Sequence, residues 1–287
     1  MAAAHQGTPD QVVRRLLDHF EARLDLDHVA AVHRLHRAAL DFAPVERLPL
    51  VFYLPYEGDA FAPYPFAEAF HDPAKLMVNE LLAGFSSPYH ALDLRHDAPL
   101  CLRPNLGTGI VASMFGAHVR LMEDNPPWTE SLGGTEALEC MAELPLPAVE
   151  AGLGARVAEQ YAYFHTALQD YPVCRAAFQI TLPDLQGPFS TVELLWGSSI
   201  YVSLYDRPDL VRALLEKVTA QMQRVVAAWG PYTREDSGAG YCYQHNVGSK
   251  GPLLVRDDSM ILLSPGMYAD LVLPFDAQIA DALDGAG

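Results

Sequence analysis

Hydrophobic residues recur at helical spacing in several parts of the chain. The longest such pattern runs from Leu210 to Trp229, with apolar side chains three and four residues apart. Shorter patterns of the same kind lie at residues 12–20, 29–40, 76–82, 153–168 and 267–283. Thr8 and Gln11 form a capping-box pattern ahead of the first of them. The sequence therefore predicts a framework of amphipathic helices.

Continuous apolar runs of strand length separate these helices. We expect strands at residues 50–54, 99–105, 118–123, 174–182 and 253–255. Strands that alternate with helices predict an α/β protein with a parallel sheet. We expect a helical extension at residues 1–44 and a parallel sheet, as either a barrel or an open sheet, at residues 45–287, in one domain overall. Five strands are found, whereas a closed (β/α)8 TIM barrel needs eight, so a barrel would either be incomplete at the C-terminus or be completed by residues beyond 287.

The segment at residues 252–274, PLLVRDDSMILLSPGMYADLVLP, is the first candidate for part of a functional site. Its apolar run ends at Asp257 and Asp258, and a helix is expected to begin with Ser264 as its N-cap. In α/β proteins, side chains at the carboxyl ends of strands form the site. Neighbouring strand residues point to opposite faces, so we expect one of the two carboxylates to act as a general acid or base. The alternative is that both only form a turn before Ser259.

Further polar side chains follow other predicted strands. We expect Gln179 and His245 to join the two aspartates as catalytic groups, with His245 in a long glycine-rich connection at residues 230–251. The side chains expected to bind substrate are Tyr53, Tyr56, Asn105, Asp184 and Tyr241. Simple packing is the alternative for the tyrosines, and an ordinary loop residue is the alternative for His245.

Metal-ligand patterns are weak in this sequence. His33 and His36 lie three residues apart, but no cysteine or carboxylate partner is near, so we expect them on the solvated face of their helix. The cysteines are far apart and predict reduced, mostly buried thiols: Cys101, Cys140, Cys174 and Cys242. No metal ligand is assigned.

The composition of the chain limits the kinds of molecule that we expect it to bind. The 287-residue chain has 36 acidic and 19 basic residues, a net charge of -17, which disfavours binding to nucleic acid. The sequence has no run of eighteen apolar residues and no basic region followed by an apolar stretch at its N-terminus. We therefore expect a cytoplasmic protein with no membrane partner that acts on a small molecule. Assembly as a homodimer is left open.

Three phrases, in order along the chain, carry a resemblance to a known family. They are Gly187–Phe189 with the following LLWG, then YDRPDLVRALLEKVTAQM, then DDSMILLSPGMYADLVLPF. Over roughly residues 45–285 the chain resembles the uroporphyrinogen decarboxylase superfamily. That superfamily contains the decarboxylase and zinc-dependent methyltransferases that work with corrinoid proteins. The resemblance implies an eight-fold β/α barrel that moves a methyl group between a small substrate, a corrinoid carrier on a partner protein and a thiol.

Two departures from the family pattern limit what the resemblance implies. The decarboxylases carry an arginine-rich signature where this chain reads LPYEGDAFAPYPF, and tyrosines with Glu57 would bind an acidic tetrapyrrole poorly. Decarboxylation of a tetrapyrrole is therefore the alternative function, with Arg103 and Arg256 as the nearest cations. The zinc ligands of the methyltransferases lie after the last helix of this chain, so we expect the natural protein to extend past Gly287.

Two further interpretations stay open at this stage. One is a barrel that only binds a ligand or partner and has no catalytic activity. The other, more remote, is a glycosidase that uses Glu193 and Asp257 as paired carboxylates, although no aromatic platform pattern accompanies them.

Overall fold

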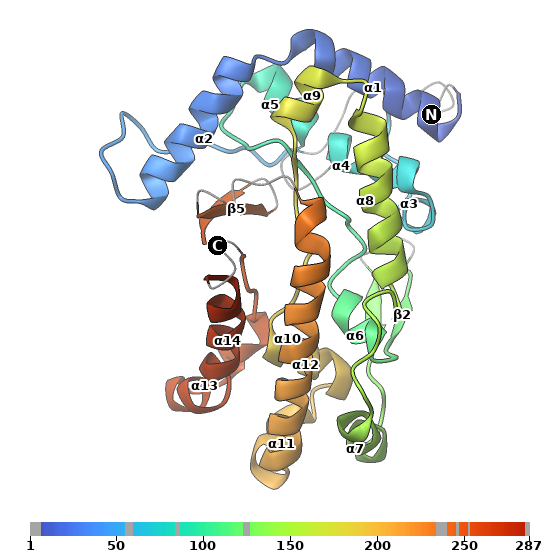
Figure 1. Ribbon diagram of the computed structural model, residues 1–287, viewed down its shortest axis with the longest axis vertical. Coiled ribbons are helices and arrows are strands. Elements are labelled where there is room, and N and C mark those ends of the chain that lie inside the picture. Colours follow the sequence, from blue (N-terminus) through green and yellow to red (C-terminus); the bar gives the residue numbers. More distant parts are fainter. Residues whose placement is uncertain are drawn as a thin grey trace. The chain divides into compact units, whose positions relative to one another are not determined.

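The computed structural model describes residues 7–54, 60–83, 87–122, 127–233, 240–244, 247–251 and 253–284. Contacts divide the chain into two compact units, each made of three segments. Unit 1 comprises Met1–Asn105, Glu159–Pro183 and Tyr232–Leu254, and unit 2 comprises Leu106–Ala158, Asp184–Pro231 and Val255–Gly287. Helices predominate in the described residues (Figure 1). The expected division into a helical extension and a barrel at residue 44 stays a prediction.

Unit 1 contains mainly helices and two small sheets. Its helices are α1 (Pro9–Arg23), α2 (Leu26–Leu40), α3 (Phe66–Ala69), α4 (Pro73–Ala83), α5 (Pro88–Leu94), α9 (Pro172–Ala177) and the later part of α8 (Gly154–Leu168). Its strands are β1 (Cys101–Leu102), β4 (Gln179–Ile180), β5 (Tyr241–Gln244) and β6 (Val247–Lys250). Strands β1 and β4 are parallel, whereas β5 and β6 are antiparallel.

Unit 2 is also mainly helical. Its elements are α6 (Ile110–Met114), β2 (His118–Arg120), β3 (Trp128–Glu130), α7 (Thr135–Glu143), α10 (Pro188–Trp196), α11 (Ile200–Asp206), α12 (Pro208–Trp229), η3 (Asp258–Leu262), α13 (Pro265–Leu271) and α14 (Leu273–Asp284). Strands β2 and β3 form an antiparallel pair. A single parallel bridge joins Gln186 to Arg256.

Helix α1 forms as the sequence predicts. The Thr8 hydroxyl accepts the N–H of Gln11, and the Gln11 side chain accepts the N–H of Thr8, so the capping box is present. The helix buries one face against α4. On that face the Phe20 ring meets the Phe178 ring edge-on at 5.3 Å between centroids. The apolar stripe read from the sequence is the core face of this helix in unit 1.

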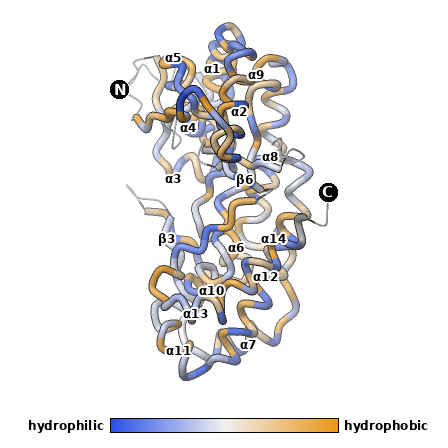
Figure 2. The backbone as a smooth tube through the Cα atoms, turned by 90° about the vertical axis from the view of Figure 1, so that its left-hand side faces the viewer, coloured by the Kyte–Doolittle hydropathy of each residue, from blue (hydrophilic) through white to orange (hydrophobic). Residues whose placement is uncertain are grey.

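Helix α12 is the packing centre of unit 2. It lies beside α10 and α14 (Figure 1). Hydrophobic and hydrophilic residues alternate along it (Figure 2), and Leu214, Val218, Met222 and Val225 on its apolar face are fully buried. The amphipathic pattern of residues 210–229 is therefore confirmed, and its role is structural.

Most of the strands expected from the sequence are absent or shortened. Residues 50–54, expected as the first barrel strand, have no regular secondary structure, and their side chains from Leu50 to Leu54 are half-buried or exposed. The Leu50 N–H donates to the Asp97 carboxylate, and the Leu50 carbonyl accepts the Asp97 N–H. Residues 50–54 belong to none of the strands in the described part of the chain, so this prediction is wrong.

Two other strand predictions fail in part for local reasons. In residues 174–182 the first half is helix α9, because Pro172 starts it and the Glu21 carboxylate accepts the N–H groups of Val173 and Cys174. Only the two residues of β4 belong to a strand. Residues 253–255 are also irregular, and the parallel contact there is limited to Arg256.

Strands were correctly located in two places. Strand β1 lies inside the predicted segment 99–105, and β2 lies inside 118–123, although β2 pairs antiparallel with β3 rather than joining a parallel sheet. A complete (β/α)8 barrel is not present in the part of the chain that the structure describes. Parallel pairing there is limited to the β1–β4 pair in unit 1 and the Gln186–Arg256 bridge in unit 2.

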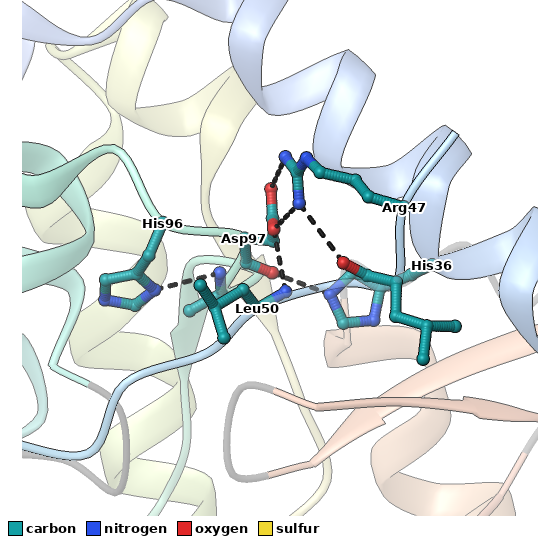
Figure 3. A network of polar contacts seen from close by, with 7 residues as sticks. His36, Arg47, Leu50, His96 and Asp97 are labelled. Atoms are coloured by element: carbon teal, nitrogen blue, oxygen red, sulfur yellow. Dashed lines mark hydrogen bonds and ion pairs between the residues drawn. The ribbon is translucent and has the colours of Figure 1, made fainter. Parts of the chain in front are cut away.

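The two histidines of α2 are buried, which corrects the expectation of a solvated face. His33 and His36 are 8% and 5% exposed. His36 Nε2 donates to the Asp97 carbonyl at 2.6 Å, and Arg47 binds the Asp97 carboxylate with two nitrogens (Figure 3). The face that carries these histidines packs within unit 1, because α2 contacts β6 and α9 there.

The state of the thiols agrees with the sequence prediction. All four cysteines are free; Cys101, Cys174 and Cys242 are buried, and Cys140 is exposed. Among the described helices, none combines the length and the apolar character that crossing a bilayer requires.

Candidate functional site

The N-terminus of helix α10 binds the carboxylate of Asp257. Asp257 accepts the N–H of Phe189 at 3.0 Å and the N–H of Ser190 at 2.5 Å. Unsatisfied N–H groups and the positive end of the helix dipole favour a negative charge at this place. A Cβ added to Gly187, the N-cap of α10, would lie 2.6 Å from Asp257 Cγ, so only glycine permits this approach.

The Asp276 carboxyl lies next to that of Asp257. Asp276 projects from α14, and its Oδ1 is buried without a donor, while its Oδ2 accepts the Tyr268 hydroxyl at 3.4 Å. Burial, and after it the charge of Asp257, raises the pKa of Asp276 to about 7. Burial also raises the pKa of Asp257, whereas its hydrogen bonds with Ser190 and Phe189 oppose that rise.

The two carboxyl groups therefore share one proton below about pH 7. Because Asp257 receives two backbone N–H bonds and Asp276 receives none, the proton resides mainly on Asp276. A carboxyl group that keeps its proton near pH 7 is suited to donate it, as a general acid does.

Further polar contacts hold the segment around Asp257. Arg256 Nη1 donates to Asp184 Oδ2 at 3.2 Å, and the Arg256 carbonyl accepts the N–H of Gly187 at 2.5 Å. The Ser259 N–H donates to the Ser190 hydroxyl at 3.0 Å. Asp184, predicted as a substrate-binding residue, is thus an ion-pair partner within unit 2 and is 8% exposed.

Asp258, the other predicted aspartate, is exposed and begins η3. Of the two adjacent carboxylates, Asp257 is therefore buried and Asp258 is not. The catalytic role of either residue stays a prediction.

The remaining described site residues lie in unit 1. Gln179 is half-buried in β4, where it pairs with Cys101. Asn105 Nδ2 donates to Glu80 Oε1 at 2.9 Å. Tyr53 is 66% exposed. Their predicted roles stay untested.

Tyr241 belongs to a polar contact at the edge of the β5–β6 sheet. Its hydroxyl donates to the Asp41 carboxylate, which Lys250 also binds at 2.6 Å. The Arg37 guanidinium lies 5.6 Å from the centre of the tyrosine ring. These contacts satisfy the Tyr241 hydroxyl within unit 1. His245 and Tyr56 fall outside the described residues, as does Glu57.

The sequence reading missed Asp276 and Ser190. A signal for Asp276 was present, because it lies four residues after Val272 and three before Ile279, on the stripe that α14 buries. A carboxylate at a core position of an amphipathic helix indicates a buried partner. Ser190 offered no comparable signal.

The described residues do not fit a zinc site of the kind that the family resemblance implies. No three His, Cys, Asp or Glu side chains in the described ranges gather so as to hold a metal ion. Burial, followed by the hydrogen bond with Glu21, raises the pKa of the Cys174 thiol well above its usual range, which disfavours the thiolate that zinc requires. We derive no step through zinc.

Comparison with solved structures finds a similar fold. A methyltransferase from Methanosarcina mazei superposes with a TM-score of 0.58 at 16% sequence identity, over 86% of this chain and 65% of that one. The chain therefore spans 65% of the length of that methyltransferase. No family model and no curated protein matches the sequence. At this identity the likeness concerns the fold.

Proposed function

We propose that this protein is a methyltransferase that moves a methyl group between a small methylated substrate, a corrinoid carrier on a partner protein and a thiol. The observation that carries the proposal is the similarity of the fold to the Methanosarcina mazei methyltransferase. The three phrases that resemble the uroporphyrinogen decarboxylase superfamily agree with this fold, and that superfamily includes methyltransferases.

Within this proposal, the carboxyl pair supplies a proton. When a methyl group leaves its heteroatom, that atom keeps the electron pair of the broken bond and needs a proton to become a neutral product. Asp276 holds such a proton near neutral pH. Asp257, which the N-terminus of α10 binds, carries the negative charge of the pair while Asp276 is protonated. Asp257 is thus a positioning residue and Asp276 the proton donor.

Decarboxylation of an acidic tetrapyrrole receives no specific support. It needs cations that are available to carboxylates, and the charge of Arg256 is already opposed by Asp184 at 3.2 Å. We therefore propose no second function.

The proposal is tested by a methyl-transfer assay on the full chain. Methylcobalamin and a small thiol are incubated with the protein; loss of the methylcobalamin absorbance and mass spectrometry of the thioether measure transfer in one direction. A panel of methylated amines, alcohols and thioethers with reduced cobalamin measures it in the other. Transfer above the uncatalysed rate in either direction supports the proposal, and no transfer in both contradicts it.

Variants connect the assay to the site. Asp276→Asn keeps the shape of the side chain but cannot donate an acidic proton, so we expect the rate with methylated amines and alcohols to fall about 100-fold. Asp281→Asn is the matched control, because it makes the same change at an exposed position of the same helix. Equal rates for Asp276→Asn and the unmodified protein would remove Asp276 from the mechanism.

A further inference from the structure

Three short helical elements of unit 2 expose apolar side chains to solvent. They are α11, η3 and α13, and no side chain of η3 or α13 is buried. Five apolar side chains on α11 and η3 are between 37% and 80% exposed: Val202, Tyr205, Met260, Ile261 and Leu262. We call these five residues the α11–η3 surface. Single exposed apolar residues are ordinary, whereas a group of them marks a surface that binds another molecule.

Hydrogen bonds join α11 to the other two elements. The Tyr201 hydroxyl on α11 donates to the Ser259 carbonyl in η3 at 3.3 Å. The Tyr205 hydroxyl, also on α11, donates to Met267 Sδ on α13 at 3.4 Å. Helices α11 and α13 lie close together in both views (Figure 1 and Figure 2). The exposed side chains of η3 come directly after Ser259, so they lie beside α11 and belong to the same surface as Val202.

Every charged side chain on these three elements is acidic. The sequences of α11, η3 and α13 contain no lysine, arginine or histidine, and each contains one exposed aspartate: Asp206, Asp258 and Asp270. The arginines that precede η3 and follow α11 are already bound, Arg256 to Asp184 and Arg207 to Glu139. The charge at this surface is therefore negative.

Helix geometry places the aspartates next to the apolar side chains. Asp206 lies four residues after Val202 on α11, and residues at this spacing are neighbours on one side of an α-helix. Asp258 lies three residues before Ile261, and side chains at this spacing are aligned along a 3₁₀-helix such as η3. The α11–η3 surface thus combines an apolar area with carboxylates at its edge.

This charge decides between the molecules that could cover the surface. A second copy of the chain would bring the same carboxylates into a symmetric contact, and a net charge of -17 adds to the repulsion. An anionic lipid surface is repelled for the same reason. A protein partner whose apolar side chains are bordered by lysine and arginine has the complementary charge.

We propose that the α11–η3 surface binds a basic amphipathic segment of a partner protein. The apolar side of that segment covers Ile261 and its neighbours, and its lysine and arginine side chains lie opposite Asp206 and Asp258. Because η3 begins directly after Asp257, the bound segment borders the carboxyl pair of the candidate site. The proposal requires no methyl-transfer activity.

A synthetic peptide is the probe, and fluorescence anisotropy with the full chain is the measurement. The peptide has about 18 residues, which is roughly five helical turns, with leucine on one side and lysine on the other. We expect a Kd of about 10 µM, with binding several-fold weaker when the salt concentration is raised from about 50 to about 500 mM. The same peptide with glutamate in place of lysine should not bind. No binding of the lysine peptide, or equal binding of both peptides, overturns the proposal.

Variants show whether the peptide binds at this surface. Ile261→Asp places a charge among the apolar side chains, and we expect binding at least about tenfold weaker. Leu48→Asp is the matched control, because it makes the same change of charge at an exposed apolar residue of unit 1, and its Kd should be unchanged. Asp258→Asn should weaken binding about threefold and reduce its salt dependence, whereas Asp281→Asn, with the same net charge, should not. Equal affinities within either pair of variants contradict the proposal.

Hydrogen exchange gives a readout that needs no variant. Amides of residues 258–263 should exchange more slowly when the lysine peptide is bound, and protection confined to other segments contradicts the proposal. Two further measurements test the other molecules that could cover the surface. A dimer in sedimentation velocity that Ile261→Asp dissociates would assign the surface to a second copy. Binding to phosphatidylserine vesicles that Ile261→Asp abolishes would assign it to a membrane, and either result overturns the proposal.

Discussion

Replacing Asp276 by asparagine should remove a pH dependence of stability that this one carboxyl imposes on unit 2. The asparagine has nearly the same shape, its amide can donate to the Asp257 carboxylate, and its carbonyl can accept the Tyr268 hydroxyl. It cannot ionise. The variant therefore tests the titration of the carboxyl pair with little change in packing.

The direction of the pH dependence follows from the number of protons bound in the folded and unfolded states. The pKa of Asp276 is about 7 in the folded protein against a usual 3.8, so between these values the folded state binds more protons than the unfolded state. Stability therefore falls as the pH rises through this window and is constant above it. The full difference between the two pKa values corresponds to about 4 kcal/mol of unfolding free energy. Because the side chain is half-buried, solvent screening reduces this contribution to about 2 kcal/mol.

The assay is urea unfolding followed by circular dichroism at pH 5 and pH 8. The unmodified protein and Asp281→Asn should lose stability over this interval by about 1 kcal/mol more than Asp276→Asn does. The general repulsion of a chain with a net charge of -17 is common to all three proteins and cancels in the comparison. Equal pH dependence in Asp276→Asn and the unmodified protein would refute the shared proton.

Three further predictions concern other parts of the chain. Asp97→Asn should destabilise the protein by about 2 kcal/mol in urea unfolding, because the buried carboxylate binds Arg47 and the N–H of Leu50, and no loss would contradict this role. Leu214→Ala should cost about 3 kcal/mol in the same assay, since the side chain is fully buried on α12; a loss below about 1 kcal/mol would contradict that packing. A colorimetric thiol reagent should titrate one cysteine, Cys140, in the native protein and all four in guanidinium chloride, and rapid reaction of more than one would contradict the buried thiols.

The helices were predictable because their signals lie within the helices themselves. The capping box at Thr8, Ser264 as the N-cap of α13, and the apolar stripe from Leu210 to Trp229 all depend on residues within a few turns of one another. The error on α2 has the same origin. The helix was correctly expected, but the partners of His33 and His36 come from distant segments, so their burial left no local signal.

The strands were not predictable to the same degree. An apolar run such as LVFYL at residues 50–54 forms a strand only if a neighbouring segment supplies hydrogen bonds. The sequence of the run does not show whether such a segment is present. Residues 174–177 show the opposite case, in which Glu21 from α1 caps a helix in a run read as strand. Both errors arise from contacts between segments, which override the intrinsic preference of the run.

The candidate site also depends on contacts between residues far apart in the sequence. Asp257 was found because it follows an apolar run, but its binding partner, the N-terminus of α10, lies about seventy residues earlier. The phrases GPF at Gly187–Phe189 and DDS at Asp257–Ser259 are the two halves of this one contact, in which a glycine admits the carboxylate and the helix binds it. Because this contact holds unit 2 together whatever reaction is catalysed, the phrases bear on the fold, and the chemistry has to be established by methyl transfer itself.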